Sequence, residues 1–282
     1  MASSAPVQAS LEMRGYNNVV AASLVETDVG GSEACVASVR AAFAELSDAL
    51  STPTGRRGLD VKFNVCGGAA AAAAAADGVP VHYGGGAAAS AGGVAAGGGG
   101  GPLELVANRM ELVAALSEVF PVQSNDPSCA RPACDIRAAC AAMTKTSAAS
   151  PVPHLTRLAA LAAAAFGAQC VDVDHAAGRL ALNATSLDPK GSAGYGERSW
   201  FWQTCTEFGF YQTCVPGSDC PFLTTPPLLT LGSFTDECAA VFGGLDYLGV
   251  TAPAAGRANE RTGGWRPGGT RILYPSGTVD PW

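Results

Sequence analysis

Ten cysteines constrain this chain more than any other feature of its sequence. They are spread from Cys35 to Cys238, they form no Cys-x-x-Cys motif, and only three histidines accompany them. Structural zinc sites show closer spacing of cysteine and histidine, so we expect a disulfide framework and neither a metal nor another cofactor. Disulfides persist in oxidising compartments, and the N-x-[ST] sequon at Asn183 agrees with secretory passage and with glycosylation there.

The first residues do not supply the signal that secretory passage requires. The stretch "MASSAPVQASLEMRGY" has no early basic residue followed by an apolar region. We therefore expect the signal peptide to lie upstream of this sequence.

Charge and hydropathy exclude two classes of partner. The formal net charge is −7, and nucleic-acid binding relies on clustered Lys and Arg that this chain lacks. The longest apolar runs are shorter than the ~18 residues that a membrane-spanning helix needs. We expect a chain with its own hydrophobic core, no nucleic acid and no membrane span. A homodimer is compatible with this sequence.

Helical patterns occur between Ser32 and Phe166. Ser32 is a predicted N-cap, and Pro53 and Gly55 are expected to end the helix that it starts. Apolar residues recur in this helix at steps of three and four, at Val36, Val39, Phe43, Leu46 and Leu50. Further helices are predicted near residues 103–120, 136–143 and 155–166.

Two other segments differ from this helical texture. Residues 67–102 are rich in Gly and Ala and lack the Gly-Lys-[Ser/Thr] of a phosphate loop, so we interpret them as a flexible surface insertion. After Cys170 aromatic and turn residues increase, and the runs "RLALNA" and "TRILY" resemble strands. The chain is therefore predicted to be of the α/β class, a helical part followed by part of an α/β domain.

Two late motifs carry a family resemblance. The block "SWFWQTCTEFGFYQTC" at 199–214 and the final "YPSGTVDPW" resemble the prolyl-specific serine peptidases, the family of lysosomal Pro-X carboxypeptidase, dipeptidyl peptidase II and thymus-specific serine protease. The early stretches "ASSAPVQA", "YNNVV" and "GGSEAC" are similar to the region that follows the nucleophile in that family. The motifs occur in family order along nearly the whole chain.

The resemblance implies an α/β-hydrolase fragment with a helical cap domain. Residues 1–8 would be a residual hydrolase strand. Residues 9–165 would form the cap, with the insertion at 67–102. Residues 166–282 would form the C-terminal part of the hydrolase domain.

The resemblance also implies roles for four residues. Asp280 would be the triad acid, which accepts a hydrogen bond from the histidine and fixes its tautomer. Trp282, and less directly Phe210, would form an apolar wall for a proline ring. Glu207 either reads a substrate terminus or is a hydrogen-bonded structural residue, and the sequence leaves both roles open.

Two triad members are missing from the sequence. No Gly-x-Ser-x-Gly elbow occurs, and no histidine follows Asp280, although the triad order in α/β-hydrolases is Ser, Asp, His. The three histidines, His82, His154 and His175, are expected to be solvated or to serve in packing. We interpret the sequence as an internal fragment whose serine elbow lies upstream and whose histidine lies downstream.

The parent protein is accordingly predicted to be a serine-type exopeptidase, either a Pro-X carboxypeptidase or a dipeptidyl peptidase. It would act on proline-containing peptides by acyl transfer, in a lysosome or vacuole or outside the cell, and the present chain would be inactive alone. The alternative is a non-catalytic, disulfide-bonded scaffold that binds peptides or partners. An unrelated secreted helical module would require both late motifs to be coincidental.

Sequence order together with the resemblance also implies how the cysteines pair. The expected pairs are Cys35–Cys140, Cys66–Cys170, Cys129–Cys134, Cys205–Cys238 and Cys214–Cys220.

Overall fold

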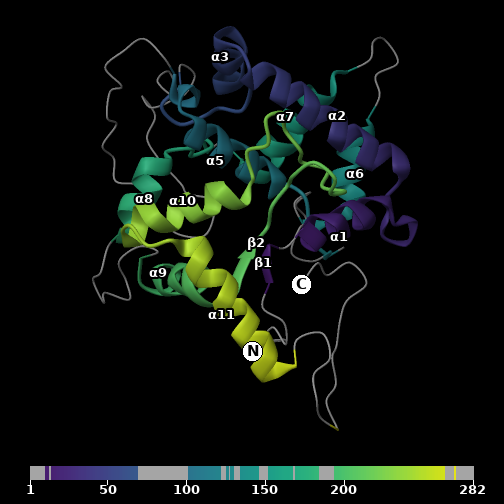
Figure 1. The fold of residues 1–282 in the computed structure, drawn as a ribbon. Helices are drawn as coiled ribbons and strands as arrows, with labels where there is room; N and C mark the ends of the chain where they lie inside the picture. The colour runs from purple at the N-terminus through teal and green to yellow at the C-terminus, as the bar shows by residue number, and fades with distance from the viewer. Residues whose placement is uncertain are drawn as a thin grey trace.

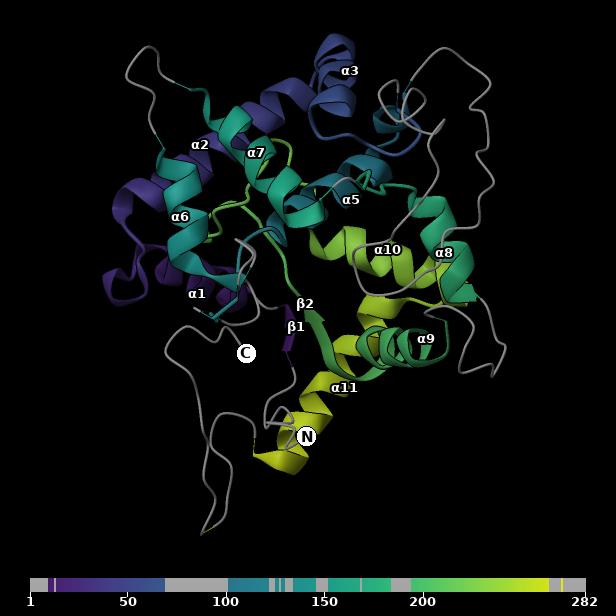
Figure 2. The ribbon, with the colours of Figure 1, turned by 180° about the vertical axis from the view of Figure 1, so that it is seen from behind.

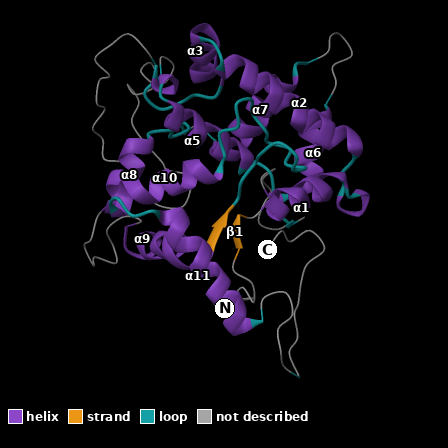
Figure 3. Ribbon diagram, in the orientation of Figure 1, coloured by secondary structure: helices purple, strands orange, loops and turns teal. Residues whose placement is uncertain are grey.

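The computed structural model of the chain describes residues 10–12, 14–68, 101–121, 125–126, 128–129, 134–145, 152–167, 169–183, 194–263 and 270. Helices dominate these residues, and their strands form one two-stranded sheet (Figure 1, Figure 3). The sheet lies between a larger group of helices, α1 to α7, and a smaller group, α8 to α11 (Figure 2).

The larger group confirms the four helices predicted between Ser32 and Phe166. Its members are α1 (Arg14–Val25), α2 (Glu33–Leu50), α3 (Pro53–Lys62), α5 (Val106–Ser117), α6 (Ile136–Thr144) and α7 (His154–Phe166), with the 3-10 turns η1 (Thr27–Val29) and η3 (Pro102–Glu104). The second predicted helix, expected over residues 103–120, starts later, at Val106, because η3 occupies its first residues.

The longest helix, α2, follows its sequence pattern closely. Ser32 is its N-cap, with a side-chain oxygen that accepts the N–H of Cys35 at 3.1 Å. The five apolar residues predicted to share one face are all buried. The periodicity of 3.6 residues therefore set both the extent of the helix and the face that it turns to the core.

Replacing Ser32 by alanine should lower the free energy of unfolding by about 1 kcal/mol, because the N–H of Cys35 loses its acceptor at the start of α2. Ser51→Ala is the matched control, since Ser51 is exposed at the other end of α2. Urea unfolding followed by circular dichroism measures both variants. Equal effects at the two positions would contradict the capping role.

The chain behaves differently from expectation around Pro53. The helix from Ser32 does end before this residue, as predicted, but Pro53 is also the first residue of α3. Thr52 caps α3 by accepting the N–H of Gly55 at 3.0 Å. Proline suits the first helical position because its missing N–H needs no partner there and its φ is already helical.

The smaller group of helices corrects a second prediction. It comprises α8 (His175–Asn183), α9 (Gly194–Gln203), the π-helical turn η5 (Thr204–Phe208), α10 (Leu231–Phe242) and α11 (Tyr247–Thr262). The run "RLALNA", predicted as a strand, lies in α8 as far as Asn183. Asp174 accepts the N–H of Ala177 at 3.0 Å and so caps α8. Ala, Leu and Arg then favour the helix. The run "TRILY" lies outside the described residues after Thr270.

The sheet joins the start of the described chain to a segment almost 200 residues later, before α10 and α11. Strand β1 (Ser10–Glu12) pairs in parallel with β2 (Gly209–Tyr211), Ser10 opposite Gly209 and Glu12 opposite Tyr211. Parallel neighbours require a crossover connection, and here the helices from α1 to η5 occupy it. The described helices of the first half are therefore inserted between two adjacent parallel strands.

Two hydrophobic cores hold these elements. The larger core gathers apolar side chains from α1 to α7 and from the segment after β2, including Phe43, Phe120 and Phe222. The smaller core consists of Cys205, Tyr211, Cys238 and Tyr247, with aromatic residues of α9 and α10 packed against it.

The predicted cysteine pairing is confirmed. The structure contains Cys35–Cys140, Cys66–Cys170, Cys129–Cys134, Cys205–Cys238 and Cys214–Cys220, with Cα–Cα distances between 5.0 and 6.0 Å. These distances lie in the range that disulfide geometry allows.

The described helices are short compared with the thickness of a bilayer. No single one of them is long and apolar enough to cross a bilayer. Only α10 and α11 taken together reach that length and composition, and they are bent by 105° where they meet.

Candidate functional site

The carboxyl ends of the two parallel strands are the first place to look for a site, because α/β proteins gather functional groups there. Asn17, in the α1 helix that follows β1, is buried. Its side-chain amide donates to the carbonyls of Thr213 at 3.0 Å and Gln212 at 3.4 Å, just after β2. This contact joins the early motif "YNNVV" to the end of the aromatic and cysteine block.

The aromatic and cysteine block itself is fixed at several points. Cys205 is bonded to Cys238 of α10, and the Thr251 hydroxyl of α11 donates to the carbonyl of Cys205. The hydroxyl of Tyr211 lies 3.1 Å from the sulfur of Cys238 and 3.3 Å from the carbonyl oxygen of Thr204. Burial raises the pKa of Tyr211 to about 12, so this phenol is a neutral structural group at physiological pH.

Two of the four residues singled out by the sequence lie on this block. Glu207 is exposed on η5, and Phe210 is half-buried in β2 with its ring stacked on Phe208 at 5.8 Å. Phe210 has a φ of 63°, a left-handed conformation that a bulky side chain adopts only where the surroundings impose it. Asp280 and Trp282 lie outside the described residues.

Asn183, the predicted glycosylation acceptor, is the last residue of α8. Its side chain is exposed. A glycan attached to Asn183 would therefore extend into solvent.

A serine and a histidine do meet in the larger group of helices, but they cannot act as nucleophile and base. The hydroxyl of Ser38 lies 2.9 Å from Nδ1 of His154 and donates to the carbonyl of Met143 at 2.6 Å. Ser38 is 3% exposed. Its only proton is already donated and no substrate can reach it, so this pair is structural, as expected for His154.

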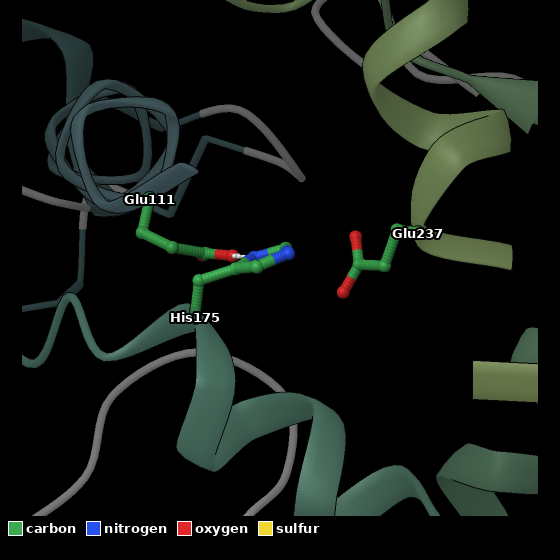
Figure 4. A group of neighbouring side chains, drawn as sticks. All are labelled: Glu111, His175 and Glu237. Carbon is green, nitrogen blue, oxygen red and sulfur yellow. Dashed lines mark hydrogen bonds and ion pairs between the residues drawn. The ribbon is translucent and has the colours of Figure 1, made fainter. Parts of the chain in front are cut away.

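A second histidine lies in a cluster that the sequence did not predict. Nδ1 of His175, at the start of α8, lies 2.6 Å from a carboxylate oxygen of Glu111 on α5. The other ring nitrogen points toward the carboxylate of Glu237 on α10 (Figure 4). His175 is buried, so it is not solvated; it is packed, one of the two roles expected for it, and it also pairs with Glu111.

The electrostatics of the cluster are those of an ion pair. The hydrogen bond to Glu111 and the attraction of Glu237 raise the pKa of His175, against the effects of burial and of Arg179. Burial and the repulsion from Glu111 raise the pKa of Glu237. The donor atoms of Glu111, His175 and Glu237 lie within 4.8 Å of one another, a spacing that could suit a divalent cation. Arg179 already brings a positive charge to the cluster, and Nδ1 of His175 already bonds Glu111. The cluster therefore favours a proton on His175 over a bound divalent cation.

The sequence offered one partial signal for this cluster. Asp174 before the Ala-rich run could have identified the start of α8 and placed His175 in its first turn. Glu111 and Glu237 come from other helices and carry no local pattern. Their positions follow only from the packing of α5 and α10 on α8.

These features define a disulfide-bonded protein in which helices are inserted between two parallel strands. The chain belongs to the serine carboxypeptidase S28 family, whose model matches residues 1–78 and 110–282. The unmatched residues between these segments include most of the Gly- and Ala-rich insertion. The family resemblance seen in the late motifs is therefore confirmed.

Curated relatives agree with the family assignment. The chain is 34% identical over 289 residues to the thymus-specific serine protease of Homo sapiens, a match that covers 100% of this chain and 48% of that protein. It is 32% identical over 290 residues to the protein of the same name from Mus musculus, with 100% and 48% covered. The chain thus spans about half the length of these relatives. No solved structure matches it significantly.

Proposed function

We propose that this chain is part of a serine-type exopeptidase that cleaves next to proline by acyl transfer, with Asp280 as the acid of a Ser-Asp-His triad. The observation that supports the proposal is the family match, which runs through residue 282 and so covers Asp280. The acid accepts the Nδ1 hydrogen bond of the histidine and stabilises the imidazolium formed when serine attacks the carbonyl.

The aromatic and cysteine block suits a substrate wall in this proposal. Phe210 is held in a left-handed conformation beside Phe208, and backbone strain of this kind gathers at binding sites. With Trp282 it would contact the proline ring. Glu207 is exposed on the same turn, and a carboxylate there would suit the free amino terminus of a peptide.

The fold supports the proposal in outline. Strands β1 and β2 would be two strands of the hydrolase sheet, with β1 starting just after the strand expected at residues 1–8, and α1 to α7 would form the cap expected over residues 9–165. The helices α8 and α9, which also lie between the two strands, would belong to the C-terminal part expected over residues 166–282. The disulfides and the family are consistent with a protein of the secretory pathway. A lysosomal, vacuolar or extracellular site and a glycan on Asn183 are part of the same proposal.

Asp280→Asn should lower kcat/KM by about 10⁴-fold in the product of the complete reading frame, because the histidine loses the acceptor that fixes its tautomer. Blocked peptides ending in Pro-X and unblocked X-Pro anilides serve as substrates and separate carboxypeptidase from dipeptidyl peptidase action. Asp236→Asn, exposed on α10, should leave both rates unchanged. Wild-type turnover by Asp280→Asn on both substrates would overturn the assignment.

A non-catalytic scaffold remains the alternative function. It is favoured by the absence of a Gly-x-Ser-x-Gly motif from residues 1–282. Peptide binding without turnover by the complete protein would support it.

A further inference from the structure

The Glu111–His175–Glu237 cluster lies where the two hydrophobic cores meet. Neighbours of Glu111 on α5 belong to the larger core, and so does Val173, just before His175. Glu237 is adjacent to Cys238, which belongs to the smaller core. A contact made by His175 with both carboxylates therefore links the two cores through a polar group.

The protonation state of the imidazole decides how many of these contacts can form. Neutral imidazole has one N–H, whereas imidazolium has two. One N–H serves Glu111 at 2.6 Å, and the ring nitrogen that faces Glu237 (Figure 4) can donate at the same time only when His175 carries a proton on both nitrogens.

The charges of the cluster balance in the same state. Among the described residues, the charged groups that act on His175 are Glu111 of α5, Glu237 of α10 and Arg179 of α8 itself. With His175 protonated, two cations face two carboxylates. With His175 neutral, one negative charge is left uncompensated in a partly desolvated place, and this is costly.

We propose that protonated His175 is an electrostatic latch that holds the smaller core, through α10, against the larger core, and that the latch opens as the pH rises. It acts on the stability of the contact between the cores and is independent of the proposed peptidase activity.

The direction of the pH effect follows from the raised pKa of His175 in the folded chain. A group of this kind contributes stability that is fully present below its unfolded pKa of about 6.5. That contribution is lost as the pH rises through the higher folded value. The latch should therefore be closed in mildly acidic solution and open in alkaline solution.

Thermal unfolding of the oxidised 282-residue chain between about pH 6 and about pH 9 tests the latch. The Tm of the wild type should fall by about 3–6 °C more than the Tm of His175→Gln, which cannot be protonated in this range. His154→Gln is the matched control, because His154 faces a serine and an arginine in place of two carboxylates, and it should keep the wild-type slope. An equal slope in His175→Gln and the wild type would overturn the proposal.

A second measurement does not depend on the variant folding well. NMR titration of the wild-type imidazoles should place the pKa of His175 above that of an unperturbed histidine, and Glu237→Gln should bring it down. A His175 that titrates at or below the ordinary value would overturn the latch. A Tm that rises at alkaline pH on addition of ZnCl₂, and no longer does so in Glu237→Gln, would also overturn it and identify a metal site.

Discussion

Removal of the Cys35–Cys140 disulfide, by alanine at both positions, should lower the free energy of unfolding by about 5 kcal/mol. The bond closes a loop with a sequence separation of 105, and in the chain-entropy description a loop of ~100 residues is worth about 4.7 kcal/mol. Both cysteines are buried in the larger core, where the bond ties α2 to α6. The loss should be among the largest that any paired substitution produces here.

The Cys214–Cys220 bond provides the matched control. It is also buried, but its sequence separation is only 6, so its removal should cost roughly 2 kcal/mol by the same relation. Guanidinium unfolding under oxidising conditions measures both double variants. Equal losses would show that constraint of the unfolded chain is not the main effect of these bonds.

Phe222→Ala should lower the free energy of unfolding by about 4 kcal/mol, as is usual for a phenylalanine removed from a packed core. Phe222 is 1% exposed. Its ring lies 5.1 Å from that of Phe43 on α2 and 5.7 Å from that of Phe120 after α5. It is the main aromatic anchor by which the segment after β2 packs on the larger group of helices.

Leu248→Ala is the control for this substitution, since Leu248 is 46% exposed on α11 and should change stability by less than ~0.5 kcal/mol. Both variants are measured by urea unfolding with the disulfides intact. A loss below about 2 kcal/mol for Phe222→Ala would mean that the segment after β2 is held by its disulfide and hydrogen bonds instead.

The sequence predicted four helices of the larger group, α2, α5, α6 and α7, because their signals are local, and it predicted neither α1 nor α3. Ser32 caps α2 through an atom three residues away, and the apolar face repeats within a single helix. The same locality explains the errors. The run "RLALNA" resembles a strand if Asp174 is not recognised as the N-cap of α8. Pro53 was predicted to end a helix, but it is also the first residue of α3.

The candidate site was predicted less completely. Glu207 and Phe210 do lie together on the aromatic and cysteine block, but the role proposed for them also involves Asp280 and Trp282, which lie outside the described residues. The left-handed conformation of Phe210 had no signal in the sequence, because a phenylalanine does not favour it.

By itself the sequence determined the disulfide chemistry, the family and most helices of the first half, since cysteine count, motif order and helical periodicity are properties of residue types and short spacings. Only the tertiary structure decided which residues far apart in the sequence are in contact. His175 meets Glu111 across 64 residues, and Asn17 meets the carbonyl of Thr213 across 196. Such contacts arise when helices bury their apolar faces against one another, and the polar residues that this packing brings together leave no pattern in the sequence of either partner.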